Sequence, residues 1–309
     1  MLAIGREVLG VRYRELYGLL RGDPRHIVEI DAGRGVRFFF SSVLPEHRLP
    51  LRSYLGATLW KNGVPIGYFE GLALFERMEA GFNLFYTFRA GETAWIYRQL
   101  LACCHHLAGT RCFLLDPYQL GHENEEGITS GAFWFYRKLC YRSVDPELHD
   151  LTEREEKRMK ECGMYRTSTS VLKRLATRPV VFDAPGSEAG AWDSFQLNRL
   201  GLAVARVAAR EYGGETALMR ERSMASVAAA AGFSPGTWKK AELRAFAEIA
   251  PLLSIIPSLS QWTQAEHQLL EKIIRSKAGG DEMHHLHLTQ RHPRLRTAFL
   301  RLGSAKQQR

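Results

Sequence analysis

The chain has 309 residues, 45% hydrophobic and 24% charged, which is the ordinary composition of a folded globular protein. Its length suggests about two domains. No apolar run approaches the roughly 18 residues of a membrane span, and the first residues lack a signal-peptide pattern, so we expect neither. Five cysteines without CxxC spacing argue against a disulfide framework or a zinc finger. A cytoplasmic location is the expectation.

The net charge of +9 comes from the second half of the chain. Residues 1–150 carry 17 basic and 17 acidic residues, whereas residues 151–309 carry 25 and 16. A basic surface can attract nucleic acid, anionic lipid or an acidic protein, so an acidic macromolecule is one expected partner of this half. The other interpretation is a solvated helical surface rich in Arg, and no RNA-binding motif favours the first.

The first 50 residues read as an extension made of a helix and a β-hairpin. The apolar spacing predicts a helix over Arg6–Leu20. Two β-rich runs, His26–Asp31 and Val36–Val43, flank the glycine-containing residues 32–35, which is typical of a hairpin. A connector with prolines at both ends, Pro45 to Pro50, follows.

Residues 51–146 form the best organised block. An Asn62-Gly63 pair between two β-rich runs is the strongest short-range hairpin signal. We expect, in order, strands at Tyr54–Trp60, Val64–Phe75 and Phe82–Phe88, a helix at Thr93–Leu107, a strand at Arg111–Leu115, a loop at Asp116–Ser130, a helix at Ala132–Leu139 and a strand at Tyr141–Val144.

Helical patterns dominate residues 147–309, which we assign to a basic helical domain. Charged helices are expected at Leu148–Cys162 and Ser170–Ala176, and the linker Asp183–Gly190 is the clearest break in the chain. Further helices are predicted near 192–212, 215–231, 238–256, 263–278 and 281–302. The fold class is therefore α+β: a mixed central sheet with flanking helices, followed by an all-helical C-terminal domain.

The segment FYRKLCY at Phe135–Tyr141 resembles the F-Y-x-K-x-G-F signature of the GNAT superfamily of acyl-CoA-dependent N-acyltransferases. The order of elements over about 90 residues is similar to that family, although Cys140 stands where the family has Gly. The resemblance implies that Tyr136 is the general acid that protonates the departing CoA thiolate. A phenol with a pKa near 10 suits that role. The alternative is a core aromatic residue in an aromatic neighbourhood.

The resemblance also implies a phosphate-binding turn, where small residues let backbone N–H groups close on a pyrophosphate at a helix N-terminus. Acetyl-CoA or another acyl-CoA is the implied co-substrate. Glu92 occupies the central glycine position, and a carboxylate repels phosphate unless it points away. Either Glu92 is a favourable acid in the first turn with the amides still free, or the site no longer holds CoA. The implied residues are Phe88, Arg89, Ala90, Gly91, Glu92, Thr93 and Ala94.

An amine-bearing acceptor requires a general base, and Glu70 is the candidate because a carboxylate within an apolar strand needs a reason to be there. By alternation Glu70 can instead face solvent. The loop after Leu115 contributes Asp116, Tyr118, His122 and Asn124 as acceptor-binding candidates, or it is simply an exposed polar loop. Aromatic residues of the third strand and the residues that follow it are expected to shape the acyl channel: Phe82, Phe85 and Tyr86.

No metal site is expected. His284 and His287 are spaced to bind one ion, but no further ligands accompany them, so surface histidines are the better interpretation. The competing function is a catalytically inactive GNAT-like scaffold that binds a partner through its basic helical half, and nucleic-acid binding is a third. An open cleft beside the phosphate turn favours the enzyme, whereas a cleft filled by Trp95 or Trp134 contradicts it.

Overall fold

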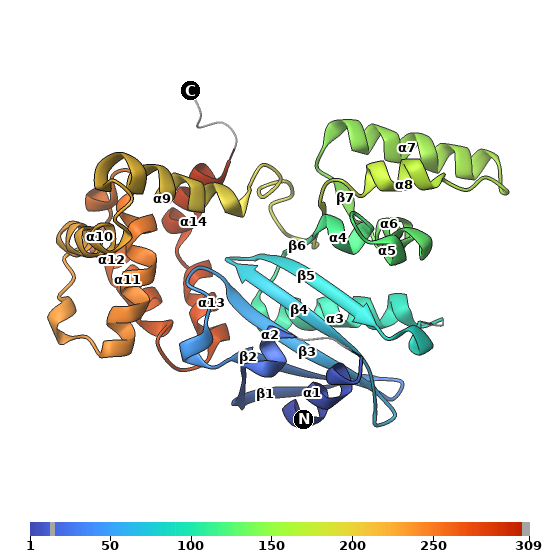
Figure 1. Cartoon of the computed structure of the whole chain (residues 1–309), viewed down its shortest axis with the longest axis horizontal. Helices are drawn as coiled ribbons and strands as arrows, with labels where there is room; N and C mark the ends of the chain where they lie inside the picture. The colour runs from blue at the N-terminus through green and yellow to red at the C-terminus, as the bar shows by residue number, and fades with distance from the viewer. Residues whose placement is uncertain (13–15, 90, 305–309) are drawn as a thin grey trace. The chain divides into compact units, whose positions relative to one another are not determined.

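The structure is a computed structural model that describes residues 1–12, 16–89 and 91–304. It contains a mixed sheet of eight strands, in the order β1-β2-β3-β4-β5-β6-β8-β7 (Figure 1). The α+β class is thereby confirmed. The strands are β1 (Gly22–Gly33), β2 (Val36–Val43), β3 (Ser53–Lys61), β4 (Val64–Leu74), β5 (Arg77–Leu84), β6 (Cys112–Leu115), β7 (Arg142–Ser143) and β8 (Val180–Asp183).

The pairing of β5 changes along its length. On one side it pairs antiparallel with β4, from Gly67 opposite Leu84 to Leu74 opposite Arg77. On the other side it pairs parallel with β6 over residues 77–79 alone, and then continues for five further residues. The crossover helix α3 (Thr93–Ala108) joins these two parallel strands. The two strands therefore separate after Glu79.

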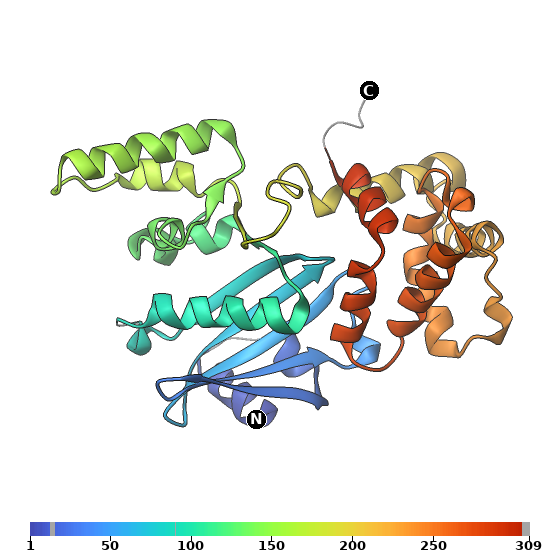
Figure 2. The same cartoon turned by 180° about the vertical axis from the view of Figure 1, so that it is seen from behind.

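Helices cover both faces of this sheet. The helix α3 lies across one face, while α1 (Leu2–Gly10) and α2 (Tyr17–Leu20) lie on the other (Figures 1 and 2). Apolar residues at helical spacing bury one side of α3, and Gly109, in the left-handed conformation with φ 61°, ends the helix. The opposite face buries a small cluster formed by Leu9, Leu16, Leu19 and Phe85.

A run of short helices follows β6. The helices α4 (Pro117–Leu120) and α5 (Glu125–Thr129) begin at Asp116 and Asn124, whose side chains accept hydrogen bonds from backbone N–H groups inside the helix. These caps are the reason that residues 116–130, predicted to be a loop, are largely helical. The helices α6 (Ala132–Arg137), α7 (Pro146–Glu161) and α8 (Thr169–Leu175) complete this part of the chain.

The chain divides into two compact units. The first contains residues 1–20, 27–41 and 55–193, and the second contains residues 21–26, 42–54 and 194–309. Residues 147–193 thus group with the sheet, although the sequence analysis assigned them to the helical domain. The second unit confirms a helical C-terminal region, with α9 (Leu197–Tyr212), α10 (Thr216–Ala231), α11 (Lys240–Ser254), α12 (Gln264–Ser276), α13 (Glu282–Gln290) and α14 (Pro293–Gly303).

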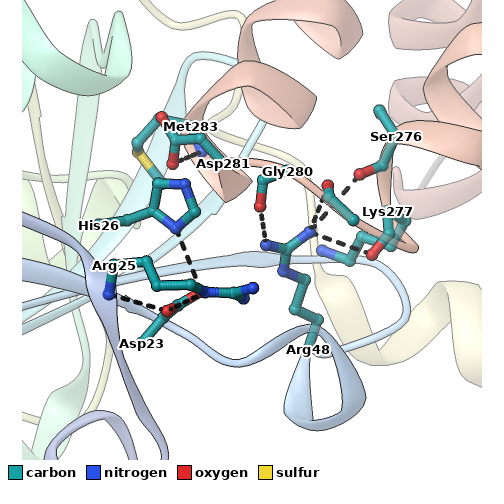
Figure 3. Close-up of polar contacts among 10 residues, drawn as sticks. Asp23, Arg25, His26, Arg48, Ser276, Lys277, Gly280, Asp281 and Met283 are labelled. Carbon is teal, nitrogen blue, oxygen red and sulfur yellow. Dashed lines mark hydrogen bonds and ion pairs between the residues drawn. The ribbon is translucent and has the colours of Figure 1, made fainter.

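A buried polar cluster ties the connector between β2 and β3 to this helical unit (Figure 3). The guanidinium of Arg48 donates at 2.5–3.5 Å to the carbonyl of Ser276, the last residue of α12, and to the carbonyls of residues 277, 279 and 280 just beyond it. Lys277 Nζ donates to the carbonyl of Arg52 at 2.9 Å and to Glu282 at 3.1 Å. The helix end, which leaves carbonyls without intrahelical partners, is satisfied in this way.

Several predicted bounds are corrected. The third strand begins at Arg77 and ends at Leu84, because a tight turn at Phe75 (φ 53°) brings the chain straight back along β4. The predicted first helix contains two helices, and its residues 13–15 lie outside the described part. The last predicted helix is divided because Pro293 is accepted only at a helix start. None of the described helices is long and apolar enough to cross a membrane.

Candidate functional site

A cleft opens in the first unit beside β5, in the region where it leaves β6. Its volume is about 330 Å³, at the lower end of the range of small-molecule sites. The walls come from β4, β5, the start of α3 and the helices after β6. The lining residues are Tyr68, Phe82, Asn83, Leu84, Arg89, Thr93, Tyr118, Gln119, Asn124, Glu126, Gly127, Ser130, Ala132, Phe135 and Tyr136.

The wall formed by β5 presents both backbone and side-chain groups. The N–H of Phe82, which has no neighbouring strand on that side, donates to Gln119 Oε1 at 3.4 Å. The ring of Phe82 packs on Tyr97 of α3, with the centroids 4.9 Å apart. The next residue, Asn83, donates from Nδ2 to the Tyr68 hydroxyl at 3.4 Å. This wall is therefore apolar at Phe82 and polar at Asn83.

Arg89 carries positive charge into the cleft. Its Nε donates to the carbonyl of Leu84 at 2.8 Å, and its Nη2 donates to Asn83 Oδ1 at 3.4 Å. Its Nη1 donates to Glu126 Oε1 of α5. Among the cleft-lining residues that the structure describes, Arg89 is the one cation and Glu126 the one carboxylate. In the cleft without a ligand, the positive charge of Arg89 is therefore balanced by the negative charge of Glu126.

The start of α3 supplies further hydrogen-bond donors. Thr93, the first residue of the helix, lines the cleft, and its Oγ1 is buried without a hydrogen-bond partner among the described residues. The first N–H groups of a helix lack intrahelical acceptors and favour anions. Gly91 adopts φ 66°, and a Cβ added there would meet open space. Ala94 is half-buried, and Ala90 lies outside the described residues.

Glu92 does not line the cleft. Its carboxylate pairs with Lys61 at the β3–β4 turn and lies 3.8 Å from Arg34 at the β1–β2 turn. The hydrogen bond from Lys61 lowers the pKa of Glu92, with a smaller contribution from Arg34. The guanidinium of Arg34 also lies 4.7 Å over the ring of Trp95. The charge of Glu92 is therefore neutralised by the hairpin turns.

Tyr136 of α6 lines the cleft and is 4% exposed. Its ring packs edge-on against Tyr97 and Tyr141, at 5.5 and 5.7 Å, and these two tyrosines share a hydrogen bond of 2.7 Å. Burial raises the pKa of Tyr136 well above its usual value, and the nearby charge of Arg89 opposes that rise. The phenol is therefore protonated throughout the physiological pH range.

Two of the predicted acceptor residues, Tyr118 and Asn124, line the cleft. Asn124 also holds its own loop, since Oδ1 accepts from the N–H of Gly127 at 3.2 Å and Nδ2 donates to the Tyr118 carbonyl at 3.0 Å. The predicted channel residue Phe82 lines the cleft as well. Asp116 instead caps α4, with Oδ1 accepting from the N–H of Tyr118 at 2.9 Å, and His122 is exposed outside the cleft.

The remaining predicted residues lie elsewhere. Phe85 and Phe88 pack with the cluster under α1 and α2, on the opposite face of the sheet. Tyr86 is 85% exposed. Glu70 lies in β4 opposite Gly81 and is outside the set of described residues that line the cleft.

Several cleft residues had no role in the sequence analysis, chiefly Tyr68, Asn83, Gln119 and Glu126. Strand alternation places Tyr68 on the same face of β4 as Glu70, but Glu70 is outside the described cleft lining, so alternation alone would not have found Tyr68. Gln119 and Glu126 reach the cleft through the helices after β6, and no local pattern marks them. His284 and His287 are both exposed, and no described group of three or more His, Cys, Asp or Glu side chains is placed to hold a metal ion.

Comparison with protein-family models, with curated proteins and with solved structures finds no match for this chain.

Proposed function

We propose that the first unit is an acyl-CoA-dependent N-acyltransferase that transfers an acyl group to an amine. The observation that carries the proposal is the open cleft that brings Tyr136 and the start of α3 together where β5 leaves β6. The residues whose side chains would contradict the proposal by filling the cleft, Trp95 and Trp134, are absent from its described lining. Trp95 lies beneath Arg34 instead.

The residues of the cleft fit the chemistry of an acyl-CoA. Arg89, the unpartnered Thr93 hydroxyl and the first amides of α3 suit phosphate oxygens. Apolar walls at Phe82 and Phe135 suit the acyl chain. Because the volume of about 330 Å³ is small, the cleft suits the thioester end of the donor while the nucleotide end extends outside it. The chain length of the acyl group stays open.

In the proposed reaction the amine attacks the thioester carbonyl and gives a proton to water, the C–N bond forms and the C–S bond breaks. Tyr136 gives its proton to the departing thiolate, and its raised pKa keeps that proton in place until then. Burial raises the pKa of a thiol in the cleft as it raises that of the phenol, so the donor and the acceptor of this proton shift in the same direction. Glu70, outside the cleft lining, takes no part in this scheme.

We place the protein in the cytoplasm, because its five cysteines are all free. The basic helical unit would recruit an acidic macromolecule.

The test is calorimetric titration of acetyl-CoA, and separately of a long-chain acyl-CoA, into the purified protein. Binding near 1 µM, about −8 kcal/mol, is the expected result for one of the donors. Thiol release with a panel of amines then follows. Tyr136→Phe should keep donor binding and lower turnover by about 10²–10⁴-fold. The control Tyr86→Phe, at an 85% exposed residue outside the described cleft lining, should keep both donor binding and turnover. Absence of binding by both donors at millimolar concentration would overturn the proposal in favour of an inactive scaffold.

A further inference from the structure

The ion pair between Arg89 and Glu126 joins the segment that follows β5 to α5, and both residues line the cleft. The two side chains are 32% and 55% exposed, so solvent reaches the pair. Exposed pairs of this kind contribute little to stability, and other ions exchange with them easily. The pair is therefore open to competition from any charged ligand that enters the cleft.

The two partners are held very differently. Arg89 is oriented without Glu126, because Nε and Nη2 are anchored by the carbonyl of Leu84 and by Asn83. The helix α5 is also positioned without Glu126. Asn124 caps the helix. Gly127 also packs closely against Gly121, since a Cβ added to Gly127 would lie 2.9 Å from the Cα of Gly121. Loss of the ion pair would therefore leave Arg89 pointing into the cleft and α5 in place.

We propose that Glu126 occupies the position on Arg89 that an anionic group of the acyl donor takes, and that the donor, by displacing it, frees Glu126 to act as the general base. This inference rests on the proposed acyltransferase function. Glu126 is the one described carboxylate of the cleft lining, so the displaced group stays within the site. Glu92 does not compete in this way, because its partners Lys61 and Arg34 do not line the cleft.

The released carboxylate completes the proton balance of the reaction. As the amine nitrogen bonds to the thioester carbon, its proton passes to Glu126. The C–S bond breaks, and the thiolate takes the proton of Tyr136. The proton on Glu126 then returns through water to the tyrosinate, so amine and thioester become amide and thiol. Because the base is free only after the donor arrives, the donor binds before the amine.

The test compares the wild type with Glu126→Gln and with the control Glu125→Gln. Glu125 is the neighbouring residue on α5, and it pairs with Lys173 outside the cleft. Titration of CoA, and of inorganic pyrophosphate, should show binding to Glu126→Gln that is about 3- to 5-fold tighter at low salt, the gain from removing one exposed competitor. Glu125→Gln should match the wild type. With an amine acceptor, turnover should fall by about 10²–10⁴-fold in Glu126→Gln and should be unchanged in Glu125→Gln.

Two contrary results separate the possible failures. If the wild type binds CoA and Glu126→Gln binds it equally or more weakly, the displacement is refuted while the acyltransferase proposal stands. If neither protein binds CoA at millimolar concentration, the acyltransferase proposal fails and this inference falls with it.

Discussion

Replacement of Arg48 by Met should destabilise the helical unit far more than its position in a connector suggests. Arg48 is 7% exposed, and its guanidinium donates to the carbonyls of residues 276, 277, 279 and 280 at the C-terminal end of α12. Burial lowers the pKa of Arg48, so its charge is held at a cost that those bonds and the nearby carboxylate of Glu282 offset. Methionine keeps part of the stem but supplies no donor.

The expected loss follows from these contacts. A hydrogen bond to a charged group contributes about 1.5–3 kcal/mol, but bonds that share one guanidinium do not add. Removal of one partner from a buried charged cluster costs about 3–5 kcal/mol. Since Met also relieves the desolvation of Arg48, we expect about 3 kcal/mol. In thermal unfolding this corresponds to a decrease in Tm on the order of 10 °C.

Urea unfolding followed by the fluorescence of Trp238 and Trp262, both buried in the helical unit, measures the loss. Arg244→Met is the matched control, because Arg244 also donates to the connector, at the carbonyl of Glu46, but is exposed. It should change the free energy of unfolding by no more than about 0.5 kcal/mol. A loss below about 1 kcal/mol for Arg48→Met, with unchanged m-value, would refute the idea that Arg48 holds the connector to the helix end.

Two further predictions concern charge. His285 is buried, and desolvation lowers its pKa well below 6.5. Below pH 6.5 the unfolded chain therefore binds more protons than the folded one, and the helical unit should lose stability as the pH falls. His285→Gln should flatten this slope in thermal melts between pH 5 and 8, and an unchanged slope would contradict the assignment. Glu92→Gln should tighten pyrophosphate binding by up to about threefold at low salt, because Lys61 and Arg34 lose their carboxylate partner near the start of α3. Weaker binding of pyrophosphate would mean that Glu92 positions the turn rather than neutralising the two nearby cations.

The elements that the sequence predicted well are those specified by neighbouring residues. The Asn62-Gly63 turn has φ of 48° and 79°, the conformation that this pair favours, and the strands on either side follow from it. The helix α3 begins at Thr93 as expected and ends one residue later than expected, at its glycine cap. By contrast, β8 was missed, because its four residues become a strand through pairing with β6, about 70 residues earlier in the chain. No local pattern carries that information.

The same difference between local and long-range determinants explains which residues of the candidate site the sequence could predict. The FYRKLCY segment contributes the helix α6, and Tyr136 of that helix lines the cleft, while its catalytic role stays a prediction. The third strand was predicted to run to Phe88, but β5 ends at Leu84, so Phe85 and Phe88 fall beyond the alternation and turn to the opposite face. Glu126 meets Arg89 across 37 residues. Judged from its neighbours in the sequence alone, Glu126 is an ordinary acidic residue in the first turn of a helix.

Glu92 shows how a residue that looks unfavourable in isolation becomes compatible with an anion site. Taken with its immediate neighbours, a carboxylate in the central position of a phosphate turn should repel the ligand. In the fold, two hairpin turns from earlier in the chain bring Lys61 and Arg34 to it, and the carboxylate pairs with them rather than facing the cleft. The β1–β2 hairpin, predicted as a mere extension, thus contributes one of the cations that shield the turn. The carboxylate stands at one position in the sequence, and the cations that neutralise it stand at two others that only the folded sheet brings together.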